Sequence, residues 1–348
     1  MKKTLLSVSL AAALAAAGSA NALVVNPDGT GGGLIQVTGL DWLPGSVLVT
    51  PTGNVQNVSQ AGVGDVLQTY AQGTLSTFTL NGNNRSSELS GTEEWTFVTG
   101  FQESIIAKST SPITPVGDSA SFTNIAGGDN YFEIYYSADP LDESNALTGD
   151  GFATGTRILW GTVLPYDFTD GTGFSTFGVS SAPIPGVNDI PLDNFPTGDN
   201  DYPAIQTITG SGGGKIKVQI DGFDSNFFVD LQDLIDAGFT TLDLALVFDT
   251  QQNLNFDQVD PNSCMYTSGG MVIAAGNGYG SCDPTGTPTG SIGAINGYPG
   301  YGPNEMLMSD ASNTLHPSIP EPSSMALLGM GLLGFGAVAS RRRKDAKS

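Results

Sequence analysis

Cations, histidine and cysteine are all scarce in this sequence. Lysine and arginine supply 12 of the 348 residues against 34 aspartates and glutamates, and residues 23–319 keep only five of those cations, for a net charge of −27. A surface this acidic repels nucleic-acid phosphates and anionic lipid headgroups, so we expect no nucleic-acid partner. Divalent cations and neutral or cationic polymers stay open as partners, as does the simpler explanation that the charge only keeps the protein soluble.

Histidine occurs once, at His316, near the end of the chain. A Ser-His-Asp or Cys-His catalytic arrangement in the body is therefore excluded. Paired carboxylates are an enzymatic alternative, because a glycosidase needs only an acid and a second carboxylate, and Glu93, Glu94 and Glu133 lie on expected strands. Since some pair among so many acids always looks suitable, we expect a non-enzymatic protein with no catalytic residues and no obligatory cofactor.

The first residues, MKKTLLSVSLAAALAAAGSANA, have the three parts of a secretory signal peptide. Lys2 and Lys3 form the charged part, an alanine- and leucine-rich helix follows, and Ala20 and Ala22 occupy the two small-residue positions that a signal peptidase reads. We therefore predict export of the chain and removal of residues 1–22.

Export decides how the two cysteines are interpreted. In an oxidising compartment Cys264 and Cys282 are expected to form a disulfide, whose loop would stabilise the fold by roughly 3 kcal/mol in the chain-entropy model. A metal site here lacks further ligands, because no histidine and no second cysteine pair is nearby.

Apolar residues recur at every second position through much of the body, which predicts β-strands separated by turns rich in Gly, Asn and Asp. Such segments are GLIQVTGLDW, GTLSTFTL, EEWTFVTGF, NYFEIYYS, TRILWGTVL, KIKVQID and TLDLALVF. Many short strands at spacings near ten residues favour a mostly β, antiparallel body of the β-sandwich or jelly-roll type, with one or two short helices.

Two local predictions follow from turn and helix signals. The strands AIQTITG and KIKVQI are expected to form a hairpin across the glycine-rich turn Gly210–Gly214. The segment SNFFVDLQDLIDAG, residues 225–238, has apolar residues at helical spacing, so we predict a helix that Ser225 or Asn226 caps and Gly238 ends.

Composition suggests how the chain is divided. Residues 23–260 form the expected β body, and a stretch rich in proline and aspartate at 180–203 is either a surface loop or a boundary between two domains. Residues 261–319 have weak periodicity and much Gly, Ser, Asn and Pro, so we predict loops fixed by the disulfide that end in an exposed tether.

Residues 320–348 have the layout of a membrane-directed signal. Pro320, Glu321 and Pro322 precede an uncharged, Gly/Leu-rich run that is expected to form a transmembrane helix, although its apolar part is shorter than a bilayer core. A basic cluster follows at once and keeps the end of the chain on the cytoplasmic side. The cluster consists of Arg341, Arg342, Arg343 and Lys344.

This ordered combination resembles the PEP-CTERM sorting signal of Gram-negative bacteria. The resemblance implies recognition by an exosortase-type membrane enzyme, a transient inner-membrane anchor, cleavage near the Pro-Glu-Pro, and delivery to the cell surface or extracellular matrix. More loosely, GLDWLPGSVLV, TYAQGTLSTF, EEWTFVTGF and NYFEIYYSADP resemble the flocculation-associated PEP-CTERM proteins, whose family role is to hold cells in exopolysaccharide aggregates.

Two candidate ligand sites remain. Tyr131, Glu133 and Tyr135 share one face of an expected strand and would contact sugar rings if that face is exposed; a second layer covering the face is the alternative. Acidic loops are weak candidates for Ca²⁺, which prefers oxygen ligands. These loops contain Asp139 and Asp142, and the denser group Asp189, Asp193, Asp199 and Asp201.

Taken together, the sequence predicts an exported surface protein that associates with exopolysaccharide in flocs or biofilms without catalysing a reaction. The alternatives are a carbohydrate-active enzyme that acts on matrix glycans and a structural protein that associates with copies of itself.

Overall fold

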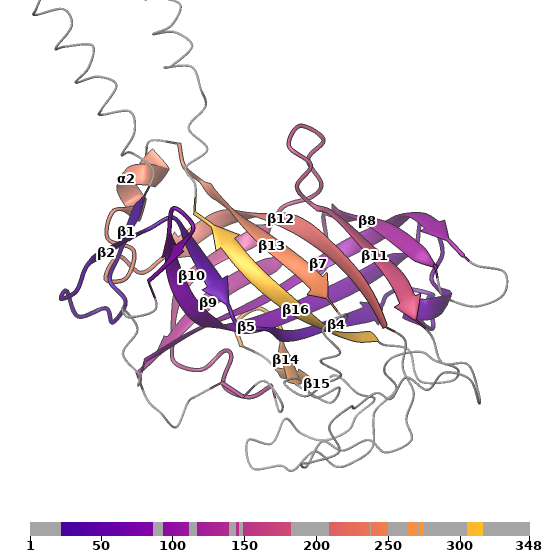
Figure 1. Cartoon of the computed structure of the whole chain (residues 1–348), viewed down its shortest axis with the longest axis horizontal. Helices are drawn as coiled ribbons and strands as arrows, with labels where there is room; N and C mark the ends of the chain where they lie inside the picture. The colour runs from indigo at the N-terminus through magenta and orange to yellow at the C-terminus, as the bar shows by residue number, and fades with distance from the viewer. Residues whose placement is uncertain are drawn as a thin grey trace, which may run out of the picture.

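The structure is a computed structural model of the chain (Figure 1). It describes residues 22–85, 93–110, 117–138, 144–145, 149–181, 209–236, 238–249, 264–270, 272–274 and 305–315. Of the described residues, 59% are in strands and 4% in helices, and the strand pairs are antiparallel, which confirms the predicted fold class. The described residues include no helix long and apolar enough to cross a bilayer. The predicted signal helix and C-terminal helix lie outside them.

Most strands belong to one twelve-stranded sheet. It contains β3 (Gly39–Trp42), β4 (Gly45–Pro51), β5 (Val66–Leu80), β6 (Asn83–Asn84), β7 (Glu94–Ser109), β8 (Ser119–Ile125), β9 (Tyr131–Ser137), β10 (Thr156–Val163), β11 (Phe174–Ser181), β12 (Thr209–Phe223), β13 (Thr241–Asp249) and β16 (Glu305–Thr314). Two smaller antiparallel pairs accompany it: β1 (Leu23–Val25) with β2 (Ile35–Val37), and β14 (Cys264–Tyr266) with β15 (Val272–Ala274). The short helices are η1 (Val58–Gln60) and α2 (Leu231–Asp236).

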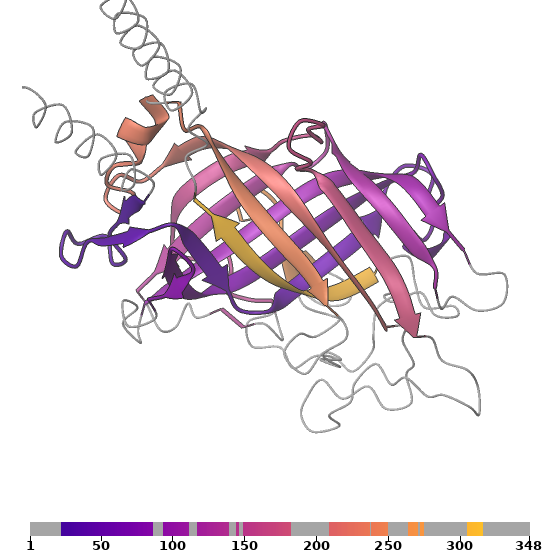
Figure 2. The same cartoon turned by 45° about the horizontal axis from the view of Figure 1, so that its top comes forward.

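The large sheet closes on itself. The long strand β7 pairs with β5 on one side, and on the other with β9 near its start and β8 near its end. β9 leads through β10 to β12, and β8 leads through β11 to the same strand. From β12 the order runs through β13 to β16, which pairs with β3 and β4, and both of these pair with β5. In Figure 2, β12, β13 and β16 cross in front of β5 and β7.

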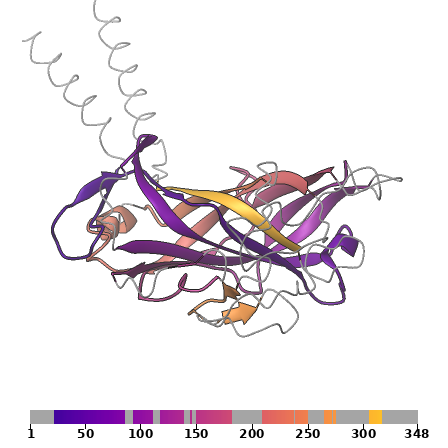
Figure 3. The same cartoon turned by 60° about the horizontal axis from the view of Figure 1, so that its bottom comes forward.

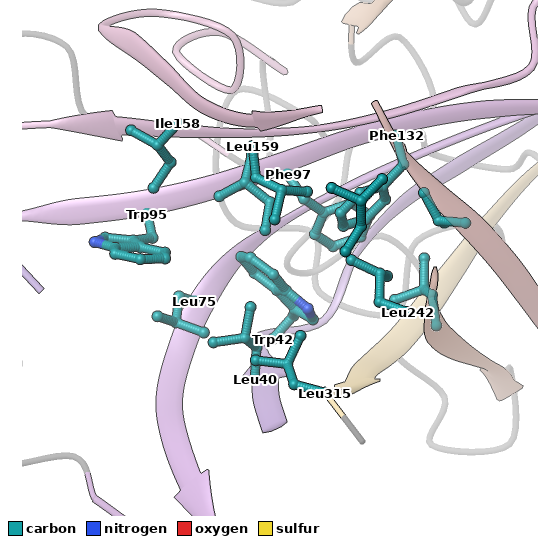
Figure 4. Close-up of a cluster of buried hydrophobic side chains, with 14 of the residues drawn as sticks. Leu40, Trp42, Leu75, Trp95, Phe97, Phe132, Ile158, Leu159, Leu242 and Leu315 are labelled. Carbon is teal, nitrogen blue, oxygen red and sulfur yellow. The ribbon is translucent and has the colours of Figure 1, made fainter. Parts of the chain in front are cut away.

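Alternating side chains fill the inside of this closed sheet (Figure 4). Trp95 lies edge-on to Phe78, with ring centroids 5.2 Å apart, and Trp42 lies edge-on to Phe97 at 4.8 Å. All four side chains are at most 1% exposed. Edge-to-face packing adds to the free energy gained by burying aromatic rings, so these contacts strengthen the attachment of β7 to β5 and to β3.

The glycine-rich segment Gly210–Gly214 is not a hairpin turn, contrary to the sequence prediction. It lies inside the continuous strand β12 and pairs with β11 on one side and β13 on the other. A Cβ added at Gly212 would lie 2.0 Å from the carbonyl oxygen of Thr176. Glycine is therefore needed here because the backbone of β11 approaches closely, and not because the chain reverses.

The helix predicted over residues 225–238 is shorter in the structure. Only Leu231–Asp236 is helical, while Phe228 forms a β-bridge with Val25. Gly238 ends the helix with φ +100°, as predicted.

The predicted tether at the end of the 261–319 region is partly wrong. Residues 305–314 form β16, which joins β13 to β3 and β4 in the closed sheet. Weak periodicity concealed this strand, because the short side chains of Ser309, Ala311 and Ser312 do not give a clear apolar alternation.

Strands on both sides of the candidate boundary at 180–203 also join the one sheet, since β11 pairs with β12.

Candidate functional site

Tyr131, Glu133 and Tyr135 lie on β9 and point away from the closed sheet's interior, whereas Phe132 and Ile134 belong to the core. The predicted alternation is therefore confirmed. Of the two alternatives for this face, the structure has the covered one, because the three residues are 5%, 2% and 6% exposed, and the condition for contact with sugar rings is not met. The segment that contains β14 covers this outer face, and Figure 3 shows β14 and β15 outside the main sheet.

Glu133 fastens the covering segment to the sheet. Its carboxylate accepts hydrogen bonds from the Tyr135 hydroxyl at 2.7 Å, from the Ser268 hydroxyl at 3.1 Å, and from the backbone N–H of Gly269 at 3.1 Å. Arg157 Nη1 completes the set with an ion pair at 2.7 Å. A buried carboxylate surrounded by donors holds structure together and has no vacant side for a ligand.

The neighbouring tyrosines are also fixed. The Tyr131 hydroxyl donates to the carbonyl oxygen of Tyr266 in β14. Burial raises the pKa of Tyr131 and Tyr135, and it raises the pKa of Tyr70 and Tyr266 to about 12. These phenols therefore stay neutral over the physiological pH range, and the hydroxyls of Tyr70, Tyr131 and Tyr135 donate hydrogen bonds.

The other predicted carboxylates do not form a pair with Glu133. Glu94 accepts hydrogen bonds from the backbone N–H of Ser144 at 2.7 Å and from its hydroxyl at 2.6 Å. On β7 it lies four residues from Val98, the residue opposite Glu133, which is about 13 Å along an extended strand. The two carboxylates therefore have separate sets of partners: Glu94 binds Ser144, and Glu133 binds the segment after β14.

A second buried glutamate lies inside the closed sheet and was not singled out in the sequence. Glu103 on β7 accepts hydrogen bonds from Thr69 at 2.9 Å and from Ser175 at 2.5 Å. Burial raises its pKa, against the opposing effect of these two hydrogen bonds. Asn124 lies directly opposite it on β8, and neither polar atom of the Asn124 carboxamide has a hydrogen-bond partner among the described residues. No sequence pattern distinguishes Glu103 from the many acids on the surface.

The most exposed aromatic group of the described body is on the outer surface, in the loop between β10 and β11. Phe168 is 88% exposed and Phe174 is 38% exposed. Tyr166 lies between them, with ring centroids 4.5 Å from Phe168 and 6.4 Å from Phe174. Together with apolar side chains of β7 and β8, the three rings line a shallow, open pocket of about 490 Å³. We call these three rings the aromatic pocket.

The loop that carries the aromatic pocket is fixed to the sheet by short polar contacts. Asp167 and Asp170 each accept hydrogen bonds from the backbone N–H and hydroxyl of the threonine two residues on. Lys217 on β12 forms an ion pair with Asp170. Partial burial works against ionisation of Asp170, but hydrogen bonds from Lys217 and Thr172 outweigh it and lower its pKa to about 2. These contacts hold the backbone of the loop, from which Phe168 projects, against β12.

The remaining predicted sites lie largely outside the described residues. These are the sorting residues Pro320, Glu321 and Pro322, the basic cluster Arg341, Arg342, Arg343 and Lys344, Ala20, Cys282, and the candidate calcium ligands Asp139, Asp142, Asp189, Asp193, Asp199 and Asp201. Within the described ranges, no group of three or more His, Cys, Asp or Glu side chains is placed to hold a metal ion. Cys264 begins β14, whereas Cys282 lies outside the described residues. The disulfide between them therefore stays a prediction.

Comparison with protein families identifies the C-terminal signal. Residues 318–344 match the family described as the PEP-CTERM protein-sorting motif. The protein is therefore exported, passes through a membrane-anchored stage, and is processed by an exosortase membrane enzyme. Comparisons with curated proteins and with solved structures gave no match, so the body is described by its own geometry.

Proposed function

We propose that the exported body associates with exopolysaccharide through the aromatic pocket and does so without cleaving it. The observation that carries this proposal is the exposure of Phe168 beside Tyr166 and Phe174 on a protein that is otherwise strongly acidic. A contiguous exposed apolar patch, unlike a single exposed side chain, indicates a binding surface, and Ile106, which is 47% exposed, extends the patch that these rings form. The PEP-CTERM signal delivers this surface to the outside of the cell.

The chemistry of the pocket fits a neutral sugar chain. The electron-rich face of an aromatic ring attracts the weakly positive C–H groups on one side of a pyranose ring. The Tyr166 ring is tilted by 67° to that of Phe168 and by 50° to that of Phe174, so each ring offers its own face to a sugar. The high negative charge of the body disfavours anionic lipids and acidic polymers. One pocket binds weakly, so retention in a matrix or floc depends on many copies contacting one polymer.

The test is a binding assay with the processed protein and the host's own exopolysaccharide. Phe168→Ala is expected to weaken binding about tenfold, as for a typical aromatic residue at a binding surface. Val63→Ala is the matched control, because Val63 is also exposed, at 65%, and lies outside the pocket.

Each outcome of this assay separates the proposal from an alternative. Binding that Phe168→Ala weakens, with polymer length unchanged, supports a non-enzymatic binder. Shortening of the polymer would identify a carbohydrate-active enzyme, and absence of binding would favour a self-associating surface protein. A strain that lacks the gene and still aggregates normally would contradict a role in flocs.

A further inference from the structure

The first and last described strands of the body meet at one end of the molecule. Leu315, the last described residue, is 3% exposed, and its backbone N–H donates to the carbonyl oxygen of Thr38 at 2.9 Å. Thr38 follows directly after Val37, the residue in β2 that pairs with Leu23. Leu23, 1% exposed, and Leu315 therefore lie beside the same short stretch of chain.

Helix α2 completes this end of the molecule. The backbone N–H of Val24 donates to Asp230 Oδ1 at 2.8 Å, and that of Val229 donates to the carbonyl oxygen of Val24 at 3.0 Å. Figure 1 shows β1, β2 and α2 together at one end of the closed sheet. We call the surface formed by β1, β2, α2 and Leu315 the terminal face.

Very little chain separates the terminal face from the sorting signal. The signal begins at residue 318, so two residues, 316 and 317, lie between it and Leu315. Three fully extended residue steps span at most about 11 Å, which is close to the distance between two packed sheets. An enzyme that holds the signal must therefore come close to the terminal face, provided that the body is folded.

We infer that the terminal face is the surface that the folded body presents to the membrane-bound sorting enzyme, and that the enzyme acts on a body whose sheet is already closed by β16. Leu315 is part of the core, so its hydrogen bond and burial keep the start of the signal within about 11 Å of the body. Residue 22, the first described residue, precedes β1 on the same face.

The inference is tested by changing the length of the connection in the full-length precursor, in a host that contains the sorting enzyme. One variant lacks His316 and Pro317, and a second replaces the same two residues with ten Gly and Ser residues. Ten residues inserted after Gly53 serve as the control, because Gly53 is exposed and a Cβ there would contact nothing within 4 Å. Gly53 follows β4, in which Val49 pairs with Glu305, the end of β16 that is farther from Leu315. The measurements are the rate at which intact precursor disappears and the protease resistance of the remaining precursor.

The deletion is expected to slow processing at least tenfold, because it draws the signal against the terminal face, and the ten-residue replacement is expected to restore the rate. The control insertion should be processed at the original rate. Protease-resistant precursor should accumulate in the deletion variant, since all hydrogen bonds up to Leu315 are retained.

A deletion variant that is processed at the original rate would overturn the inference, because it would show that the enzyme acts before the body folds. Failure of the ten-residue replacement to restore processing would also overturn it, because recognition would then depend on His316 and Pro317 themselves. A protease-sensitive precursor would likewise contradict it. None of these readouts involves polysaccharide, so the proposed function is tested separately.

Discussion

Arg157 Nη1 lies 2.7 Å from Glu133 Oε1, and the Arg157 guanidinium also lies 4.7 Å from the centre of the Trp160 ring. Arg157 is one of only five cations between residues 23 and 319, and its side chain keeps 38% exposure while that of Glu133 keeps 2%. The arginine therefore neutralises a buried carboxylate from the rim of the covered face.

Glu133→Ala is expected to destabilise the body by about 2–4 kcal/mol, because several donors lose a charged acceptor at once. Ser268 and Gly269 should become accessible to protease before the sheet unfolds, since Glu133 holds them. Denaturant unfolding and limited proteolysis measure the two effects. Asp233→Ala on the exposed face of α2 is the control and should change stability by less than about 0.5 kcal/mol. Equal stability of the two variants would show that Glu133 does not fasten the covering segment.

Glu103→Gln is expected to stabilise the body at neutral pH. Because burial raises the pKa of Glu103 in the folded state, the folded protein binds a proton more tightly than the unfolded chain does. The protonated Glu103 side chain contributes its full stability when the pH is below its pKa in the unfolded chain, near 4.5. This stability is lost as the pH rises toward the higher pKa that Glu103 has in the folded protein. Because glutamine does not ionise, Glu103→Gln should not lose stability as the pH rises. Its melting temperature should therefore exceed that of the original protein above pH 4.5, and the two melting temperatures should converge below pH 4.5. Melting temperatures between pH 4 and 8 measure this, with Glu93→Gln as control. A constant difference across the whole range would contradict the prediction.

Gly212→Ala is expected to cost about 3 kcal/mol, because the new methyl group would overlap the backbone of β11 and push β11 and β12 apart. Gly32→Ala is a matched control: a Cβ there would contact nothing within 4 Å. Thermal unfolding gives the stability of each variant. A loss in Gly212→Ala alone reports the close approach of β11, whereas an equal loss in both variants would report the reduced flexibility of alanine relative to glycine. A neutral Gly212→Ala would place Gly210–Gly214 in a turn, as the sequence first indicated.

The exported protein is expected to contain a disulfide between Cys264 and Cys282. Gln72 Nε2 donates to the carbonyl oxygen of Cys264 at 2.8 Å, so the bridge would fix the following segment against β5. Replacing both cysteines with serine should lower the stability by about 3 kcal/mol. Intact mass before and after alkylation, without reducing agent, checks the bond directly. Reactive thiols in the exported protein would contradict it.

The alternation of apolar residues was enough to predict individual strands. KIKVQI and NYFEIYYS each place alternate residues in the core, as expected for β12 and β9. Which strands pair could not be predicted, because the pairing of β16 with β3 joins residues more than 270 positions apart. Gly210–Gly214 was misassigned because a glycine run has the same composition in a turn and in a closely packed strand.

The candidate sites were predicted less well than the strands. Tyr131, Glu133 and Tyr135 were placed on the correct face, but a single strand does not reveal that a distant segment covers it. The aromatic pocket was missed because its rings come from a turn, YDFTDGTGF, whose Gly and Asp content indicates only a loop. The sequence did contain one indication of the aromatic pocket: three of the nine residues in this segment, which connects two strands, are aromatic. The sorting signal was predicted well because it acts through linear order and charge.

The order in which the strands close the sheet has a consequence for damage outside the cell. β16 is the final piece, and β13, β3 and β4 all depend on it as a neighbour. A protease that removed residues 305–315 would leave these strands with unpaired N–H and C=O groups, which readily recruit strands from other molecules. Loss of this one strand would thus open the closed sheet and give it two edges at which strands of other molecules can add.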